Sequence, residues 1–413
     1  MDTTDLFTSA LGLCEPWKVL RTEFNPESKE IHLYIDFPRG THFSCPTCDK
    51  SCPIHDTSEK TWRHLDFFEH KTYLHARVPR TDCKTHGVLQ ASLPWSRPNS
   101  GFTLLCESLF TTLARSMPVL AIARFFGEHD TRLWRSIKHQ VDEARKKVDM
   151  SKVTAIGMDE TSVRKHHKYL TIFNDLSTSN VLFATPGKGS ETIVPFKIDF
   201  IKHGGIVDNI KQVSMDMSPA FIKGVTQQLP QAAITFDKFH VFKIVSTALD
   251  EVRRNEQNDY PEYYDLLKGS RYSLLVNIEN MNKKATEDVE RIAFSKLNLK
   301  TGRAWRMKQA FSEAYSLKGK IGIAELSKWC SWAFRSQLQP MIDAAKTIKA
   351  HWNGVINYFL TGVTNAVMES TNASFQAARA AARGYRNPTY AIVILYLKAG
   401  GLDIPDLNKT HTK

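Results

Sequence analysis

Two pairs of metal-binding side chains, each separated by two residues, most constrain how the first hundred residues can fold. Cys45 and Cys48 form the first pair and Cys83 and His86 the second, with 34 residues between them. Each spacing puts two ligands on one tight turn, and two such turns complete a tetrahedral Cys3His zinc site. Because four protein ligands leave no open position, we predict a structural zinc ion that replaces the core a small module lacks.

Two neighbouring side chains compete for the fourth position of this site. Cys52 and His55 follow the first pair closely and have the same ligand chemistry. The segment between the pairs predicts short strands at residues 62–65 and 73–79, which would bring the pairs together. The seven cysteines are odd in number and unevenly spread, which argues against a disulfide framework and fits a reducing compartment.

The charge of the chain is concentrated after residue 150. Of 413 residues, 55 are Lys or Arg and 43 are Asp or Glu, which gives a net charge of +12. Residues 1–150 hold 20 basic and 19 acidic side chains, whereas residues 151–413 hold 35 and 24. Excess positive charge favours a polyanionic partner, most often nucleic acid, although an ordinary basic surface gives the same count.

The length of the chain predicts two to four domains. No run of about 18 apolar residues is present, which excludes a transmembrane helix and a membrane partner. The acidic start, residues 1–5, lacks the basic segment and apolar core of a signal peptide. We therefore expect a cytoplasmic protein.

Residues 118–145 predict a helix-turn-helix. Two helical patterns meet at Gly127, which suits a left-handed turn, and Asp130 is placed to cap the second helix. The apolar stripe of the second helix is Leu133, Trp134, Ile137 and Val141. The basic side chains on its other faces, which we predict to contact DNA, are Arg132, Arg135 and Lys138. A plain helical hairpin is the alternative.

Short β-branched and aromatic runs begin at about residue 152. They predict strands at 153–158, 169–174, 181–185, 213–215 and 232–236, of which three end at Asp159, Asp216 and Asp237. Asp159 and Asp216 are 57 residues apart and suit neighbouring strands of one sheet. Hard oxygen ligands in this arrangement hold Mg²⁺ for chemistry on phosphates, although strand-end aspartates also form ordinary turns.

A third carboxylate is predicted on a helix near the C-terminus. Residues 241–360 are helical and basic, with 19 Lys or Arg against 13 Asp or Glu, and we interpret them as an all-helical insertion. Glu369 is then the only acid of the next helix, whose buried stripe we predict as Val367, Phe375 and Ala378. The three basic residues that follow and suit a phosphate backbone are Arg379, Arg383 and Arg386. An ordinary exposed glutamate is the alternative at position 369.

The order of these motifs resembles the "ISL three" group of bacterial insertion-sequence transposases. The resemblance covers roughly residues 40–400, and its motifs are short one by one but specific in their order. Besides the zinc-binding pairs and the helix-turn-helix, they are Gly157-Met-Asp-Glu160, Met215-Asp-Met-Ser-Pro-Ala-Phe221, Phe236-Asp-Lys-Phe-His240, Asn365…Glu369…Asn372 and Arg383-Gly-Tyr-Arg-Asn387.

The resemblance implies a catalytic mechanism. Asp159, Asp216 and Glu369 match the DDE triad, which holds two Mg²⁺ or Mn²⁺ ions. Water frees a 3′-hydroxyl at each transposon end, and this hydroxyl attacks the target DNA. Asp237 and His240 match a D-x2-H signature, with the histidine contacting a phosphate or base and the aspartate orienting it. Asp237 is also the rival of Asp216 as second metal ligand.

The resemblance also implies the fold class and the partners. We expect a multidomain α+β protein in which an RNase-H-like α/β core is interrupted by an all-α insertion. The expected parts are a zinc-binding domain (1–100), a helix-turn-helix (101–150), the first part of the core (151–240), the insertion (241–360), the core helix with Glu369 (361–400) and a tail (401–413). Terminal inverted repeats and target DNA are the expected partners of a homodimer or larger homo-oligomer. The resemblance also implies that the protein acts in the bacterial cytoplasm, at the nucleoid when it is bound to DNA.

Two other functions fit parts of the same pattern. A sequence-specific DNA-binding regulator would need no carboxylate triad inside a basic domain. An RNase-H-like nuclease would cut DNA without joining strands.

Overall fold

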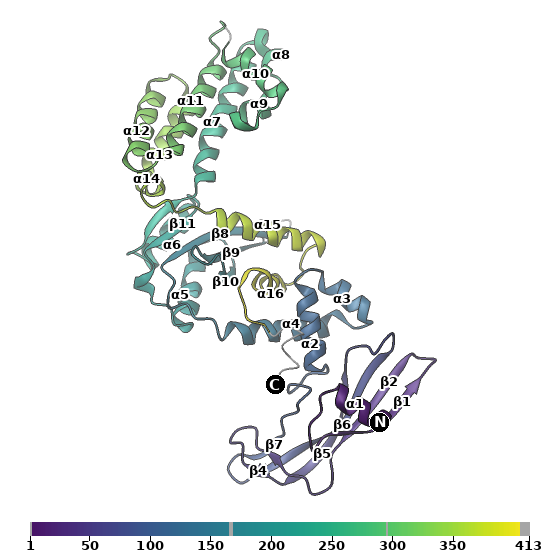
Figure 1. Ribbon diagram of the computed structural model, residues 1–413. Helices are drawn as coiled ribbons and strands as arrows, with labels where there is room; N and C mark the ends of the chain where they lie inside the picture. The colour runs from purple at the N-terminus through teal and green to yellow at the C-terminus, as the bar shows by residue number, and fades with distance from the viewer. Residues whose placement is uncertain (1, 165–167, 295, 405–413) are drawn as a thin grey trace. The chain divides into compact units, whose positions relative to one another are not determined.

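The computed structural model describes residues 2–164, 168–294 and 296–404 (Figure 1). The chain forms two compact units, Met1–Lys147 with Ala377–Lys413 and Val148–Gln376. The predicted tail at 401–413 lies outside the described residues from position 405 onward.

The first unit contains a sheet of five strands that carries the second zinc-binding pair at its β6–β7 turn, whereas Cys45 and Cys48 lie between the short paired strands β3 (Phe43–Ser44) and β4 (Ser51–Cys52). The strand order of the five-stranded sheet is β1-β2-β6-β5, and β7 pairs with the C-terminal part of β6, residues 80–83. The strands are β1 (Lys18–Asn25), β2 (Glu30–Asp36), β5 (Ile54–Arg63), β6 (Lys71–Cys83) and β7 (Gly87–Gln90), after the short helix α1 (Thr3–Ala10). Trp17, Trp62, Leu74 and Trp95 form the centre of its core. Strands were expected in this region, but β5 lies mostly before the predicted 62–65, and β6 is longer than 73–79.

Three helices follow in the same unit. They are α2 (Leu104–Ala114), α3 (Val119–Phe126) and α4 (Asp130–Arg145). Gly127 takes the left-handed conformation with φ 63° and ends α3, as the sequence predicted. The predicted stripe of α4 is buried in full. The predicted cap is wrong by one residue, because His129 occupies the cap position and Asp130 is the first residue of the helix.

The last described helix packs on this helical group. The sequence predicted one final helix within 361–400, whereas the structure has two, α15 (Ala366–Ala381) and α16 (Pro388–Ala399). Tyr390 of α16 stacks on Trp134 of α4 at 4.1 Å between ring centroids, and Arg145 lies 4.0 Å from the ring centroid of Tyr396. The residues after position 377 therefore belong to the first unit.

The second unit is built on a mixed sheet of five strands in the order β10-β9-β8-β11-β12. β8, β9 and β10 are antiparallel, and β11 and β12 run parallel to β8. The strands are β8 (Ala155–Arg164), β9 (Lys168–Asp175), β10 (Val181–Pro186), β11 (Gln212–Met215) and β12 (Ala233–Phe236). Helices α5 (Ile193–Lys202) and α6 (Pro219–Gln228) come before and after β11. The prediction that a strand ends at Asp159 is wrong, because β8 continues to pair with β9 for several residues beyond it.

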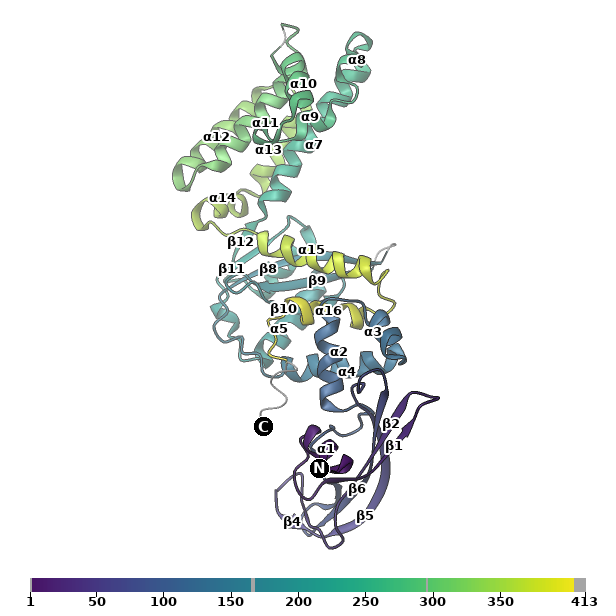
Figure 2. The same ribbon diagram turned by 45° about the vertical axis from the view of Figure 1, so that its right-hand side comes forward.

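An all-helical segment follows β12 (Figure 2). It begins at Lys238, three residues before the predicted start at 241. Its helices are α7 (Lys238–Asp259), α8 (Tyr264–Leu267), α9 (Arg271–Leu275), α10 (Lys283–Ala293), α11 (Lys300–Ser316), α12 (Gly319–Arg335), α13 (Gln339–Ala350) and α14 (Trp352–Thr361). Their buried side chains continue the core of the sheet, so insertion and sheet share one hydrophobic core.

Helix α15 returns the chain to the sheet and lies across β8 and β9 (Figure 1, Figure 2). The stripe predicted for it is partly wrong, because its buried residues are Met368, Thr371 and Phe375. Val367 and Ala378 are only half-buried. The register is set by polar contacts that the apolar pattern does not encode, such as the 2.8 Å hydrogen bond from Asn174 Nδ2 to Thr371 Oγ1.

We predict that Gly157→Ala loosens α15 from the sheet. A Cβ atom there would lie 2.9 Å from Leu176 Cδ2, 3.1 Å from Asn365 Oδ1 and 3.1 Å from Met368 Cγ. Overpacking of this kind costs roughly 1–3 kcal/mol, so amide exchange within residues 366–376 should accelerate about tenfold or more. Hydrogen exchange with mass spectrometry measures this. Lys152→Ala, at an exposed position before the same strand, is the control, and equal exchange in both variants would contradict the prediction.

Candidate functional site

The two predicted zinc-binding pairs come together in the first unit. Cys45 Sγ lies 3.6 Å from His86 Nδ1, Cys83 Sγ lies 3.6 Å from the same nitrogen, and Cys48 Sγ lies 3.8 Å from Cys83 Sγ. All four ligand atoms are within 4.8 Å of one another. Three sulfur donors and one imidazole nitrogen at this spacing fit a tetrahedral zinc ion with no position left for a substrate.

The backbone of the second pair favours the thiolate that a zinc ligand must be. Backbone N–H groups of His86 and Thr85 lower the pKa of Cys83 to about 6. Backbone N–H groups of Thr47 and Cys48 lower the pKa of Cys45 in the same way. The fold of these turns therefore prepares two of the sulfurs to bind a cation.

Cys52 and His55 are not part of this cluster. Cys52 is buried beside it, but its thiol donates to Lys50 O at 3.3 Å, and burial raises its pKa. His55 pairs with Asp56 at 3.3 Å. The alternative assignment of the fourth ligand is therefore not supported by the geometry.

Three predicted aspartates stand at one level of the second sheet. The parallel ladder pairs Ser214 with Gly157, and Asp216 and Asp159 follow each of these by two residues. The next ladder pairs Met215 with Phe236, so Asp237 comes beside Asp216, and Asp237 N donates to Met215 O at 2.8 Å. Adjacent strands are roughly 4.8 Å apart, which makes this a row of neighbouring carboxyl groups.

Asp159 is the most perturbed carboxyl group of the row. Burial raises its pKa to about 6, and the neighbouring Asp216 and Asp237 push it in the same direction. Asn372 of α15 donates from Nδ2 to Asp159 Oδ2 at 2.7 Å, and Glu160 N donates to Oδ1 at 2.8 Å. A divalent cation between Asp159 and Asp216 would favour the charged form of Asp159, against the effects of its burial and of the neighbouring carboxylates.

Asp237 and His240 form a pair at the start of α7. Asp237 is buried and caps the helix by accepting from Phe239 N at 3.4 Å, while His240 Nδ1 lies 3.0 Å from Asp237 Oδ2. This hydrogen bond raises the pKa of His240, and the charges of Asp237, Asp216 and Asp159 add to the effect. Asp216 instead accepts from Ser218 N at 2.9 Å in the turn after β11.

Glu369 forms no three-ligand cluster with the aspartates among the described residues. Its side chain is exposed, one helical turn before Asn372. Among the residues that the structure describes, the zinc cluster is the only group of three or more His, Cys, Asp or Glu ligand atoms within 4.8 Å. The amide side chains contact β8 instead, since Gln376 Nε2 donates to Thr161 Oγ1 at 2.7 Å. The sequence pointed to Asn372 only as a polar neighbour and did not reveal its bond to Asp159.

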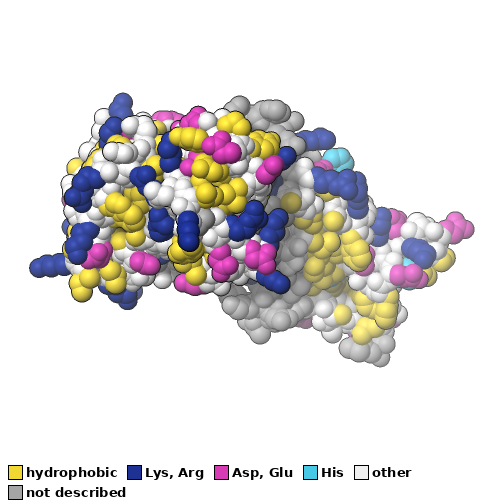
Figure 3. All heavy atoms as spheres, turned by 90° about the horizontal axis from the view of Figure 1, so that it is seen from above, with side chains coloured by type: hydrophobic (Ala, Val, Ile, Leu, Met, Phe, Trp, Pro, Cys, Tyr) yellow, Lys and Arg dark blue, Asp and Glu magenta, His cyan; other side chains and the backbone are white. Residues whose placement is uncertain are grey.

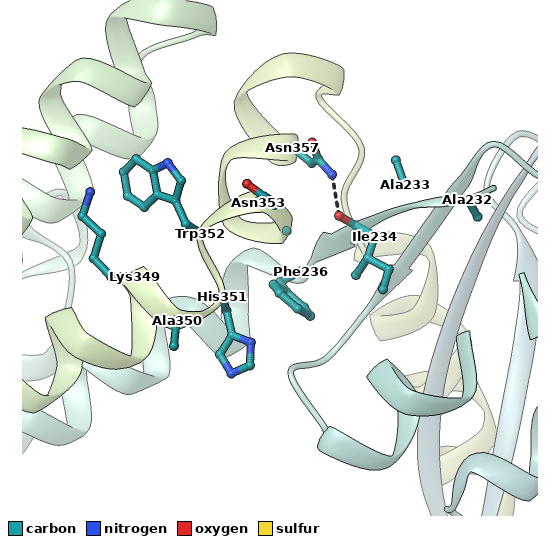
Figure 4. Close-up of a pocket in the computed structure, with 11 residues that line it drawn as sticks. Ala232, Ala233, Ile234, Phe236, Lys349, Ala350, His351, Trp352, Asn353 and Asn357 are labelled. Atoms are coloured by element: carbon teal, nitrogen blue, oxygen red, sulfur yellow. Dashed lines mark hydrogen bonds between the residues drawn. The ribbon is translucent and has the colours of Figure 1, made fainter. Parts of the chain in front are cut away.

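Two cavities lie on either side of His351. One, of about 610 Å³, is bounded by α7 and α13 and reaches Asp216 and His240. The other, of about 600 Å³, lies against β12 (Figure 4). In it, Lys349 Nζ lies 3.6 Å from the ring centroid of Trp352, and Asn357 Nδ2 donates to Ile234 O at 2.7 Å.

The predicted DNA-contacting residues all belong to the first unit. Arg132 forms an ion pair with Glu128, Lys138 forms one with Asp142, and Arg135 is exposed. Arg383 and Arg386 are exposed between α15 and α16, and Arg379 is half-buried. The structure therefore leaves Arg135, Arg383 and Arg386 with the most accessible charges of the six.

We predict about one zinc ion per chain, bound without Cys52. Cys83→Ser should lose most of this zinc because it removes a thiolate from a four-ligand site, whereas Cys52→Ser should retain it. Metal analysis of the purified proteins measures both. Retention of zinc by Cys83→Ser together with its loss from Cys52→Ser would reverse the assignment.

We predict that divalent cations bind the aspartate row with a pH dependence set by Asp159. Above a pH of about 6 the carboxylate is charged and binds the cation. Below it a proton competes, so the affinity for Ca²⁺ should fall roughly tenfold per pH unit. Calorimetric titration of the full chain between pH 5 and pH 8 measures this.

The controls for this titration are two aspartate variants. Asp159→Asn should bind Ca²⁺ weakly and without this pH dependence. Asp208→Asn, at an exposed position elsewhere in the unit, should behave as the unmodified protein does. A wild-type affinity that does not change over this pH range would refute the role of Asp159.

A membrane-spanning helix is absent from the part of the chain that the structure describes, because its helices are too short or too polar for one.

Comparison with known proteins gives matches over most of the chain. Three family models match it: a transposase model of the ISL3 family over residues 156–395, the zinc finger of transposases IS204/IS1001/IS1096/IS1165 over 41–86, and the helix-turn-helix domain of transposase family ISL3 over 91–141.

Two curated relatives extend the similarity to nearly full length. The chain is 27% identical over 391 residues to the transposase for insertion sequence element IS1557 of Mycobacterium tuberculosis (strain ATCC 25618 / H37Rv), with 86% of each chain covered. It is 26% identical over 396 residues to the transposase for insertion sequence element IS1001 of Bordetella parapertussis, with 92% of this chain and 95% of the relative covered. The zinc site, the helix-turn-helix and the sheet with its aspartates thus coincide with the three matched domains, and the chain belongs to the ISL3 family of transposases.

Proposed function

We propose that this transposase binds the ends of an insertion sequence and cuts and joins DNA by a two-metal DDE mechanism. The observation that carries the proposal is the pairing of β11 with β8, which puts Asp216 beside Asp159 in the domain matched by the transposase model. Glu369, on the helix that crosses these strands, supplies the third carboxylate. Asp216 is preferred to Asp237 as ligand because Asp237 is already committed to the cap of α7 and to His240.

The strand arrangement supports an RNase-H-like core. In chain order, the antiparallel strands β8, β9 and β10 come first, and β11 and β12 follow and run parallel to β8. Their order in the sheet is β10-β9-β8-β11-β12. A helix lies between the two parallel strands, and the glutamate arrives on a later helix, as the resemblance implied. Asp159 and Asp216 then lie where β8 and β11, the first and fourth strands in chain order, are neighbours.

The residues of the site fit hard divalent cations. Carboxylates are the donors Mg²⁺ prefers, and Asn372 Oδ1 is a buried oxygen without a hydrogen-bond partner close to Asp159. When bound, two Mg²⁺ or Mn²⁺ ions supply an activated water or 3′-hydroxyl in line with the phosphorus and stabilise the leaving oxygen. Asn372 holds the Asp159 carboxylate in one orientation through its Nδ2.

His240 has a separate task in this proposal. Asp237 fixes the imidazole through Nδ1, which leaves Nε2 to donate to a non-bridging oxygen of the scissile phosphate. The raised pKa keeps more of the imidazole protonated near neutral pH, so it also contributes positive charge. Asp237 therefore acts as a positioning residue.

DNA binding is assigned to the first unit and to exposed basic residues of the second. The helix-turn-helix presents Arg135, and its other basic side chains, Arg132 and Lys138, would exchange their acidic partners for phosphates. On the face of the molecule seen in Figure 3, Lys and Arg are spread among acidic and hydrophobic side chains. Two ends brought together would require a dimer or larger assembly.

We predict that purified protein with Mg²⁺ or Mn²⁺ nicks linear DNA at the element's own ends and joins the freed ends to target DNA. Because even outer partners of a metal ligand are typically worth 10–100-fold, Asp216→Ala and Glu369→Gln should each reduce cleavage more than about 100-fold. Asn372→Ala should reduce it about 10–100-fold. Gel analysis of cut and joined products measures this.

The outcomes distinguish the proposal from its rivals. Asp208→Asn, at an exposed position before β11, should cut as the unmodified protein does. End-specific binding without cleavage would favour a DNA-binding regulator, and cleavage without joined products would favour a nuclease. Cleavage that survives Asp216→Ala and is lost in Asp237→Ala would move the second metal ligand to Asp237.

A further inference from the structure

Helix α5 is apolar on the side that faces solvent. Its inner side packs on the sheet through three buried residues, Ile193, Phe196 and Phe200. Its outer side carries three more large aliphatic residues, which are 42%, 65% and 55% exposed: Val194, Ile198 and Ile201. A surface helix normally has a polar outer side, and a helix that is apolar all round is normally buried. The outer side of α5 therefore has the composition of a contact surface.

A charged residue stands at each end of this apolar stripe. Glu191 lies three positions before Val194, in the turn that leads into α5, and accepts from Gly189 N through Oε1 at 3.2 Å. Lys202, the last residue of the helix, lies four positions after Ile198. Residues three or four apart share one face of a helix. We call this exposed surface the α5 face: Glu191, Val194, Ile198, Ile201 and Lys202.

The order of residues on the α5 face is complementary to itself. When two copies meet about a twofold axis with their helices antiparallel, Glu191 of each copy comes opposite Lys202 of the other. Val194 of each copy then comes opposite Ile198 of the other, because both pairs have nearly the same midpoint in sequence. Antiparallel helices also bring opposite ends of their dipoles together. A twofold dimer requires such a surface, since both subunits contribute the same patch.

Helices α5 and α15 cover opposite faces of the second sheet (Figure 1, Figure 2). Phe196 of α5 stacks on Phe173 of β9 at 4.3 Å between ring centroids. The next residue of β9, Asn174, bonds instead to Thr371 of α15, because successive strand residues point to opposite faces. Since α15 also donates a hydrogen bond to Asp159, a contact through α5 leaves the aspartates of both copies open to DNA.

We propose that a second copy of this chain docks on the α5 face, so that two catalytic units pair through antiparallel α5 helices. The proposal deepens the proposed function and rests on it for its purpose, because two element ends need two active sites. The segment after residue 404 is a poor alternative occupant, because only Pro405 and Leu407 of its nine residues are apolar. One pair of helices is small beside the roughly 800 Å² per partner of a standard interface, so we expect a dimer that dissociates on dilution.

Sedimentation velocity of the full-length protein without DNA, over a wide range of concentrations, tests the proposal. The unmodified protein should change from monomer to dimer as its concentration rises. Ile198→Glu buries an unpaired charge in the middle of the contact and should weaken the dimer at least about tenfold. Ile321→Glu is the matched control, because Ile321 is 67% exposed on α12 of the same unit and should dimerise as the unmodified protein does.

An exchange of the two charges tests the antiparallel direction. Glu191→Lys places two positive charges opposite each other and Lys202→Glu two negative charges, so each variant should weaken the dimer about fivefold or more. The double variant restores opposite charges at both contacts and should dimerise within about twofold of the unmodified protein. Circular dichroism verifies that each variant is folded.

Three results would overturn the proposal. They are an unmodified protein that stays monomeric over the whole range, an Ile198→Glu variant that dimerises as well as Ile321→Glu does, or a double charge variant that stays as weak as the single ones. Cleavage of DNA ends, assayed in parallel, judges the proposed function separately, because the dimer is measured without DNA.

Discussion

The parallel pairing of β11 with β8 is the constraint on which the rest of the catalytic unit depends. The hydrogen-bond ladder that pairs Ser214 with Gly157 fixes the backbone positions of Asp216 and Asp159, which follow these residues by two positions. Hydrogen-bonded strands hold the two residues at a fixed spacing, so the carboxylates cannot separate to relieve their repulsion. Burial raises the pKa of Asp159, and the nearby charges of Asp216 and Asp237 add to the effect. Selection for stability alone does not explain why two carboxyl groups are placed so close together.

The other polar groups of the unit respond to this charge. Asn372 donates to Asp159 from a helix that is 213 residues away in sequence, and the hydrogen bond to Asp237 raises the pKa of His240, which favours its charged form. Both contacts depend on the path of the chain, because His240 lies on α7, which follows β12, and Asn372 lies on α15, which returns to the sheet. The insertion therefore does more than separate Asp216 from Glu369. Its first helix, α7, supplies His240 and one side of the cavity that reaches Asp216.

Features fixed by a few consecutive residues could be predicted from the sequence, whereas those fixed by distant partners could not. The zinc ligands, the turn at Gly127 and the buried stripe of α4 all follow from local spacing. The end of β8 was predicted too early because the strand after Asp159 is held by its pairing with β9, not by its own apolar pattern. The face of α15 was misjudged for the same reason, since Asn174 and Gly157 select it. Nothing near α16 in sequence indicates that Tyr390 stacks on Trp134.

The position of Glu369 follows from how α15 is attached. Hydrogen bonds from Asn372 and Gln376 anchor the middle of the helix to β8, and the exposed carboxylate of Glu369 lies one turn earlier, outside any three-ligand cluster among the described residues. Three carboxylates held together in advance would repel one another more strongly than the two on the sheet already do. In the proposed mechanism, adjacent strands place the two aspartates, and the exposed side chain of Glu369 would have to move toward a cation that the aspartates bind. The proposed site would thus combine two ligands fixed by the sheet with a third that the bound cation draws in.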